Sequence, residues 1–75
     1  MTQIKDIKLL HKIALVIKEL RDEKCVSQEE VYNDINIHVG RIESSKGNVS
    51  VSTLSALCKY FKIKLSDFHK RVEEM

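Results

Sequence analysis

The 75-residue sequence contains no proline, no tryptophan and only two glycines, Gly40 and Gly47. Because proline and glycine interrupt regular structure most strongly, their scarcity favours helices over long loops. Long apolar runs are also absent: the longest extends from Ile13 to Ile17, whereas a membrane-spanning helix needs about 20 apolar residues. The first residues, MTQIKD, are polar and do not resemble an export signal. We therefore expect a single all-α domain, residues 1–75, that is cytoplasmic and has no membrane segment.

The residues that usually carry chemistry are few and scattered. Cys25 and Cys58 lie far apart, without CxxC spacing or a nearby histidine pair, which favours reduced thiols over a disulfide or a zinc site. The three histidines, His11, His38 and His69, accompany no nucleophile motif, glycine-rich phosphate loop or metal-ligand spacing. We expect no enzymatic activity, no metal and no cofactor.

Apolar residues recur at helical spacing in three segments. The first spans residues 4–23, where Asp6 is a candidate cap; the second opens at Ser50 or Ser52; the last runs from Leu65 to Met75. The residues predicted to face inward are Ile7, Leu9, Leu10, Ile13, Ala14, Val16, Ile17 and Leu20 in the first segment, Val51, Leu54, Leu57, Cys58 and Phe61 in the second, and Leu65, Phe68, Val72 and Met75 in the last. The last stripe is longer than a small bundle needs, so a self-association surface is an alternative to core packing there.

Two shorter helices are predicted between these segments. Ser27 is followed three residues later by Glu30, the pattern of a capping box, which predicts a helix from Gln28 through Asp34. Asn36 tolerates a left-handed backbone better than its β-branched neighbours, so a tight turn is expected there.

The second short helix follows this turn. Ile37 and Ile42 fit as its inward anchors, which leaves His38, Val39 and Arg41 on its outer side. Two short helices joined by a few residues, with polar and basic side chains facing outward on the second, are typical of a helix-turn-helix. Its core is expected at about residues 27–46.

The distribution of charge supports a polyanionic partner for this second helix. The net charge is only +2, yet residues 19–34 carry six acidic and two basic side chains, whereas residues 35–66 carry five basic and one acidic. The positive part begins where the second short helix does, which favours nucleic acid at that surface. Ordinary solvated charge is the alternative, because three of the five basic residues lie well downstream.

Three side chains of the second helix are candidates for reading DNA. Arg41 can take a guanine edge with two hydrogen bonds or clamp a phosphate, with an ion pair to Glu43 or Asp34 as the alternative. His38 can donate to a phosphate or a base, or cap the helix instead. Val39 can meet a thymine methyl group.

The neighbouring residues are candidates for contacts with the DNA backbone. Gly40 in a short helix costs about 1 kcal/mol relative to alanine. Either close approach of the backbone to DNA or a bend or early end to the helix would explain it. The loop that follows carries hydroxyl groups, an amide and an ammonium group, all of which can bind phosphate oxygens. The alternative is that this loop only connects two helices. Its candidate contacts are Ser44, Ser45, Lys46 and Asn48.

The sequence resembles the Cro and phage-repressor type of helix-turn-helix proteins, also called the xenobiotic-response-element regulators. The likeness is carried by IKELRDEKCVSQEEV at Ile17 to Val31, RIESSKGNVSVSTL at Arg41 to Leu54, and ALCKYFKIKLSDF at Ala56 to Phe68. It implies a five-helix, lambda-repressor-like domain in which Gln28 touches the DNA backbone and the third helix enters the major groove. It also implies a homodimer on a two-fold-related operator, and a Glu43 that is held inward by hydrogen bonds.

Four differences from the family pattern bear on base reading. The segment between Val31 and Arg41 is about three residues shorter than usual, Tyr32 replaces a small residue, and Asn36 and Ser45 replace glycines. We expect a sequence-specific double-stranded DNA-binding regulator of transcription. The alternative is a protein interaction module, such as an antitoxin. In that case the last helix and the acidic helix from Gln28 through Asp34 would hold a protein partner.

Overall fold

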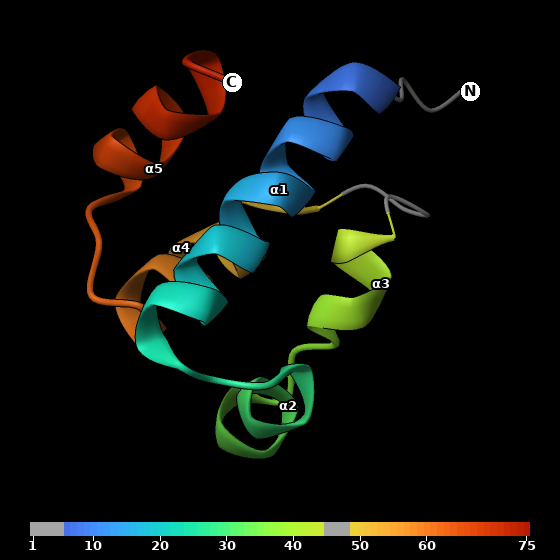
Figure 1. Ribbon diagram of the computed structural model, residues 1–75, viewed down its shortest axis with the longest axis vertical. Helices are drawn as coiled ribbons and strands as arrows, with labels where there is room; N and C mark the ends of the chain where they lie inside the picture. The colour runs from blue at the N-terminus through green and yellow to red at the C-terminus, as the bar shows by residue number, and fades with distance from the viewer. Residues whose placement is uncertain (1–5, 45–48) are drawn as a thin grey trace.

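In the part of the chain that the computed structural model describes, the protein forms five α-helices, and Figure 1 shows how they are arranged. The structure describes residues 6–44 and 49–75. The helices are α1 (Ile7–Lys24), α2 (Gln28–Ile35), α3 (Val39–Glu43), α4 (Val51–Tyr60) and α5 (Leu65–Glu73). The all-α fold with five helices is therefore confirmed.

Side chains cap the first turns of three helices. The Asp6 carboxylate accepts a hydrogen bond from the Leu9 backbone N–H at 3.0 Å, and the Ser50 hydroxyl accepts one from Thr53 at 3.1 Å. At the start of α2, the Ser27 hydroxyl accepts from the Glu30 N–H at 3.1 Å, while the Glu30 carboxylate accepts from the Ser27 N–H at 3.4 Å. These bonds satisfy N–H groups that lack helical partners. The predicted capping box is confirmed.

Left-handed residues end two of the helices. Cys25 has φ 55° and closes α1, and Asn36 has φ 57° and closes α2 with its N–H bonded to the Tyr32 carbonyl. Lys62, with φ 59°, turns the chain between α4 and α5. The left-handed turn expected at Asn36 is confirmed, and it allows α3 to begin only three residues later.

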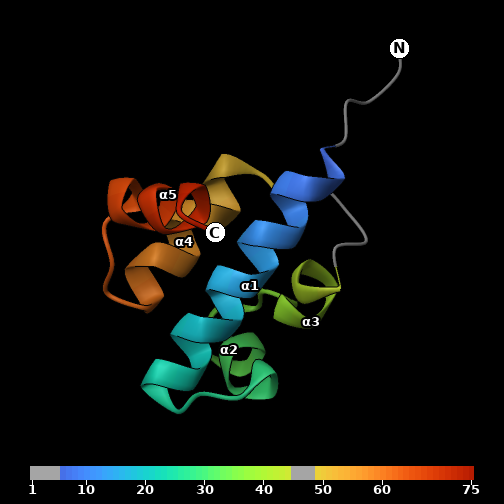
Figure 2. The same cartoon turned by 45° about the horizontal axis from the view of Figure 1, so that its top comes forward.

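The core surrounds α1, which lies between α3 on one side and α5 on the other in both Figure 1 and Figure 2. All five helices contribute buried apolar side chains to it. These are Leu10, Ile13, Ala14, Val16, Ile17, Leu20, Val31, Val39, Leu54, Leu57, Cys58, Phe61, Phe68 and Val72. Phe61 and Phe68 are the largest fully buried side chains, so the α4–α5 corner supplies much of the packed volume.

Some residues predicted to face inward are exposed. Ile7 is 67% exposed, Leu9 45% and Val51 69%, and Met75 at the chain end is 41% exposed. Helical spacing identifies the apolar side of a helix but not where the neighbouring helix stops covering it. Ile7 and Leu9 lie in the first turn of α1 and Val51 in the first turn of α4, so the uncovered positions include the beginnings of both helices.

Ion pairs explain part of the acidic segment 19–34. Nη2 of Arg71, on α5, forms ion pairs with two glutamates of α1. It lies 2.6 Å from Oε2 of Glu23 and 3.2 Å from Oε1 of Glu19. The hydrogen bond from Arg71 lowers the pKa of the Glu23 carboxyl. These acids therefore join α5 to α1 instead of forming a free acidic surface.

Within the described part of the chain, no helix is long and apolar enough to cross a membrane.

Candidate nucleic-acid interface

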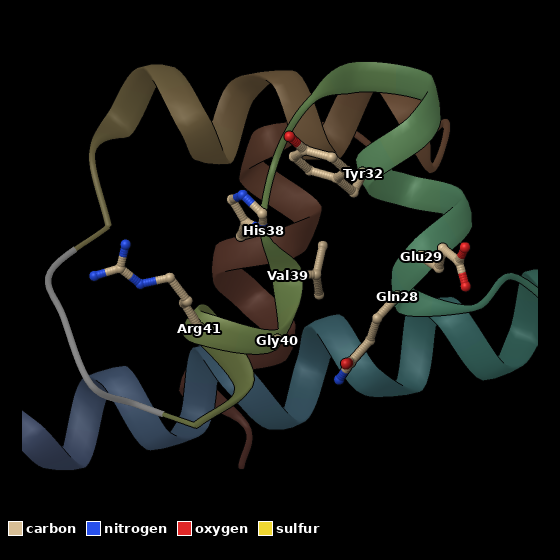
Figure 3. A pocket seen from close by; sticks show the side chains of 7 residues that line it. All are labelled: Gln28, Glu29, Tyr32, His38, Val39, Gly40 and Arg41. Carbon is tan, nitrogen blue, oxygen red and sulfur yellow. The ribbon is translucent and has the colours of Figure 1, made fainter.

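Helices α2 and α3 form a shallow hollow on the surface, which we call the α2–α3 hollow. Its lining residues are Gln28, Glu29 and Tyr32 from α2, His38 immediately before α3, and Val39, Gly40 and Arg41 from α3. Figure 3 shows the rings of Tyr32 and His38 beside each other and Gln28 directed toward Gly40, whereas Arg41 is directed away from the others. Five of the predicted contact residues are therefore brought together: Gln28, His38, Val39, Gly40 and Arg41.

The packing of Val39 sets the orientation of α3. Val39 is fully buried and belongs to the core cluster, while Ile37 and Ile42 are partly buried against that cluster. The prediction that Val39 faces outward, free to meet a thymine methyl group, is therefore wrong. A five-residue helix has fewer than two turns, so its apolar pattern fits more than one register. Here the register places Val39 inside.

A nearly buried ion pair holds the other end of α3. The Arg21 guanidinium donates from Nε to Glu43 Oε2 at 2.7 Å and from Nη2 to Glu43 Oε1 at 2.9 Å, and Nη1 donates to the Val26 carbonyl at 3.1 Å. The Arg21 and Glu43 side chains are only 12% and 11% exposed. The pair joins the C-terminal end of α1 to α3, and the expected inward position of Glu43 is confirmed.

Arg41 has neither of the ion pairs offered as its alternative use. Glu43 is engaged by Arg21, and the carboxylate of Asp34 accepts a hydrogen bond from the Tyr60 hydroxyl at 2.6 Å. This bond raises the pKa of Tyr60 to about 12. Arg41 itself is exposed and forms no ion pair within the described residues. Its guanidinium is therefore available to a ligand at the surface.

The glycine at position 40 makes room for Gln28. A Cβ added at this position would lie 3.1 Å from Oε1 of Gln28, closer than ordinary van der Waals contact. The Gln28 side chain thus crosses the start of α3 with little space to spare. This contact is a third explanation for a glycine at position 40. The two predicted explanations were close approach to DNA and a bend or early end to the helix.

His38 occupies the N-cap position of α3, but its side chain makes no capping hydrogen bond. Its imidazole instead stacks on the phenol ring of Tyr32, with the ring centroids 4.2 Å apart and the planes 26° from parallel. The sequence identified Tyr32 only as a departure from the family pattern. Glu29, which brings a carboxylate to the same hollow, was not predicted there.

The remaining predicted contacts follow α3. Ser44 ends the helix, and its hydroxyl donates to the Arg41 carbonyl at 2.8 Å. The Ser44 side chain therefore has a local partner, although the residue is exposed. Ser45, Lys46 and Asn48 lie outside the described residues, so their phosphate contacts stay predictions.

A protein-family model described as helix-turn-helix matches residues 17–68, which include all of α2, α3 and α4. The chain belongs to this family, the Cro and phage-repressor type. Its members are DNA-binding regulators of transcription rather than enzymes. Neither the curated proteins nor the solved structures provide a match. In this helix-turn-helix protein, α2 and α3 are the two helices of the motif, and Asn36 provides the turn between them.

Proposed function

We propose that this helix-turn-helix protein is a sequence-specific regulator of transcription that binds double-stranded DNA as a homodimer in the cytoplasm. The observation that carries the proposal is the charge arrangement of α3. The guanidinium of Arg41 is exposed on its outer side, while the carboxylate of Glu43 is turned inward and neutralised by Arg21. A phosphate-lined groove therefore meets the positive side chain of this helix and not the negative one.

Each proposed contact residue is assigned to the DNA backbone or to a base edge. Gln28, at the first turn of α2, donates to the DNA backbone, and Arg41 reads a base edge or holds a phosphate. Gly40 lets the α3 backbone approach a strand. Ser44, Ser45, Lys46 and Asn48 are proposed as further phosphate contacts after α3. Val39 has no place among the contacts, because it is buried.

The homodimer is supported by two considerations. Members of this family act on two-fold-related operators, and a dimer places two copies of α3 about 34 Å apart, one turn of the duplex. The exposed side chains of Leu9 and Val51 lie beside a largely apolar hollow between the first turns of α1 and α4, a surface suited to a second copy. Sedimentation equilibrium, without DNA and then with a selected duplex, measures the stoichiometry. Two chains per duplex are expected.

A salt titration tests the proposal directly. A duplex selected from a random-sequence pool is bound at ionic strengths between about 50 and 200 mM, and the logarithm of the affinity is plotted against that of the salt concentration. A slope of about −0.9 per neutralised phosphate is expected, together with weaker binding of a scrambled duplex. Absence of duplex binding at low salt would refute the proposal.

The contact assigned to Arg41 has its own test. Arg41→Ala is expected to weaken binding to the selected duplex by about 1 to 3 kcal/mol if the guanidinium reads a base. Lys70→Ala is the control, because it also removes one positive charge but lies on α5, across α1 from α3 (Figure 2). Equal affinities of the two variants would remove Arg41 from the contact surface.

A further inference from the structure

The stacked pair of Tyr32 and His38 joins the two helices of the motif at their exposed side. Tyr32 lies on α2 and is 40% exposed, and His38 lies immediately before α3 and is also exposed. Their planes are 26° from parallel and their centroids 4.2 Å apart, so the two rings are stacked in direct contact. Figure 3 shows the two rings beside each other in the hollow that also holds Arg41.

The stack gives the His38 ring a fixed position that nothing else observed around it supplies. The side chain makes no capping bond to α3, and an exposed side chain without partners samples several rotamers. Holding such a ring in place before a ligand arrives reduces the entropy lost on binding. Tyr32 therefore prepares His38 for contact at the surface proposed to meet DNA.

The charged side chains near His38 bear on how its imidazole would meet a phosphate. Glu29 and Tyr32 of α2 and Arg41 of α3 share its hollow, while Ser50 and Thr53, from the start of α4, face it on the other side and are uncharged. Of these residues, Glu29 carries a negative charge and Arg41 a positive one. A phosphate oxygen placed against the ring adds a second negative group and attracts the protonated form.

We propose that Tyr32 is a positioning residue for DNA binding, which holds the His38 imidazole against a backbone phosphate so that the duplex binds with uptake of a proton. This rests on the proposed function. It assigns a role to the residue that departs from the small side chain usual in the family. The ring, and not the hydroxyl, is the part of Tyr32 that acts.

The proposal predicts a pH dependence of DNA affinity. A lower pH favours the protonated, positively charged form of an imidazole. The affinity of the unaltered protein for its selected duplex should therefore rise as the pH falls from about 8 to about 5.5. The rise is about tenfold if the phosphate binds the protonated imidazole about 1.4 kcal/mol more tightly than the neutral one. His38→Gln should remove this rise, because glutamine does not titrate.

Substitutions of Tyr32 separate the ring from the hydroxyl. Tyr32→Phe keeps the stack and should retain both the affinity and the pH profile. Tyr32→Gln removes the ring and should weaken binding about two- to tenfold, in line with the loss of one aromatic pair, and should flatten the profile. Tyr32→Leu repeats the test with an apolar side chain, in case glutamine disturbs folding. Tyr60→Phe is the matched control, because it removes the bond to Asp34 that also holds α2 but leaves the stack intact.

The experiment measures duplex binding by fluorescence anisotropy at about pH 5.5 and about pH 8, at constant ionic strength, with folding of each variant checked by circular dichroism. Retention of the profile in Tyr32→Phe and its loss in Tyr32→Gln, Tyr32→Leu and His38→Gln are the expected results. The inference is overturned if affinity does not depend on pH, if His38→Gln keeps the dependence, or if Tyr32→Phe binds as weakly as Tyr32→Gln. Duplex binding that is insensitive to all these changes overturns this inference alone, whereas an unaltered protein that binds no duplex overturns the proposed function with it.

Discussion

Removal of the Glu43 carboxylate should destabilise the whole domain and not only α3. The variant Glu43→Ala deletes both hydrogen bonds from Arg21, at 2.7 and 2.9 Å, and leaves a guanidinium that is 12% exposed without its anion. Hydrogen bonds to charged groups contribute about 1.5 to 3 kcal/mol each, and breaking a buried pair costs about 3 to 5 kcal/mol. Because some water reaches Arg21, the lower end applies, and a loss of about 3 kcal/mol is expected.

This loss is large compared with the stability of so small a domain. At about 0.05 to 0.15 kcal/mol per residue, a chain of 75 residues has a free energy of unfolding of about 4 to 11 kcal/mol. A decrease of 3 kcal/mol would lower the melting temperature by about 12 to 24 °C, at about 4 to 8 °C per kcal/mol. DNA affinity should fall as well, because α3 loses the ion pair that joins it to α1 and keeps only its apolar packing.

Urea unfolding followed by circular dichroism measures the change in stability. Glu73→Ala is the control, because it removes an exposed carboxylate from the end of α5 and should change stability by less than about 0.5 kcal/mol. The double variant Arg21→Met, Glu43→Leu should recover much of the loss, since an apolar pair of similar size avoids the unpaired charge. A loss below about 1 kcal/mol for Glu43→Ala, the value typical of surface ion pairs, would refute this reasoning.

Two further experiments give measurable outcomes. Gly40→Ala should raise stability by up to about 1 kcal/mol, because alanine favours the helix and the atom it crowds, Gln28 Oε1 at 3.1 Å, ends a flexible exposed side chain. The same variant should bind DNA more weakly, and a lower melting temperature would show that Gln28 cannot move aside. In a Tyr32→Phe background, the phenolate absorbance of Tyr60 should appear near pH 12, and Asp34→Asn should bring it back toward about pH 10. The stabilising effect of this hydrogen bond is complete below about pH 10 and is lost as the pH rises to about 12, so titration of Tyr60 at its ordinary pH would contradict the contact.

Features set by neighbouring residues could be predicted from the sequence. The capping box of Ser27 and Glu30, the cap at Asp6 and the left-handed turn at Asn36 each depend on a few consecutive residues, and all are present. The inward position of Glu43 was predicted from the family resemblance, although its partner Arg21, 22 residues away in sequence, was not identified.

Features set by the packing of separate helices could not be predicted in the same way. Val39 was assigned to the wrong side because α3 is too short for its apolar spacing to fix a register, and burial against α1 and the core decides it. The stack of Tyr32 on His38 depends on the angle between α2 and α3, which no local pattern encodes. Leu9 and Val51 show the converse limit, since their spacing fits a core that does not reach them.

The shortness of α3 has a consequence for how operators would be distinguished. Its five residues rise by about 7 Å, little more than two base-pair steps of 3.4 Å. In the proposed homodimer each copy would therefore inspect few bases directly, and much of the discrimination would come from the separation of the half-sites and from the bending and groove width of the intervening duplex. Inserting one base pair between two half-sites should then disturb recognition more than replacing one base within either of them.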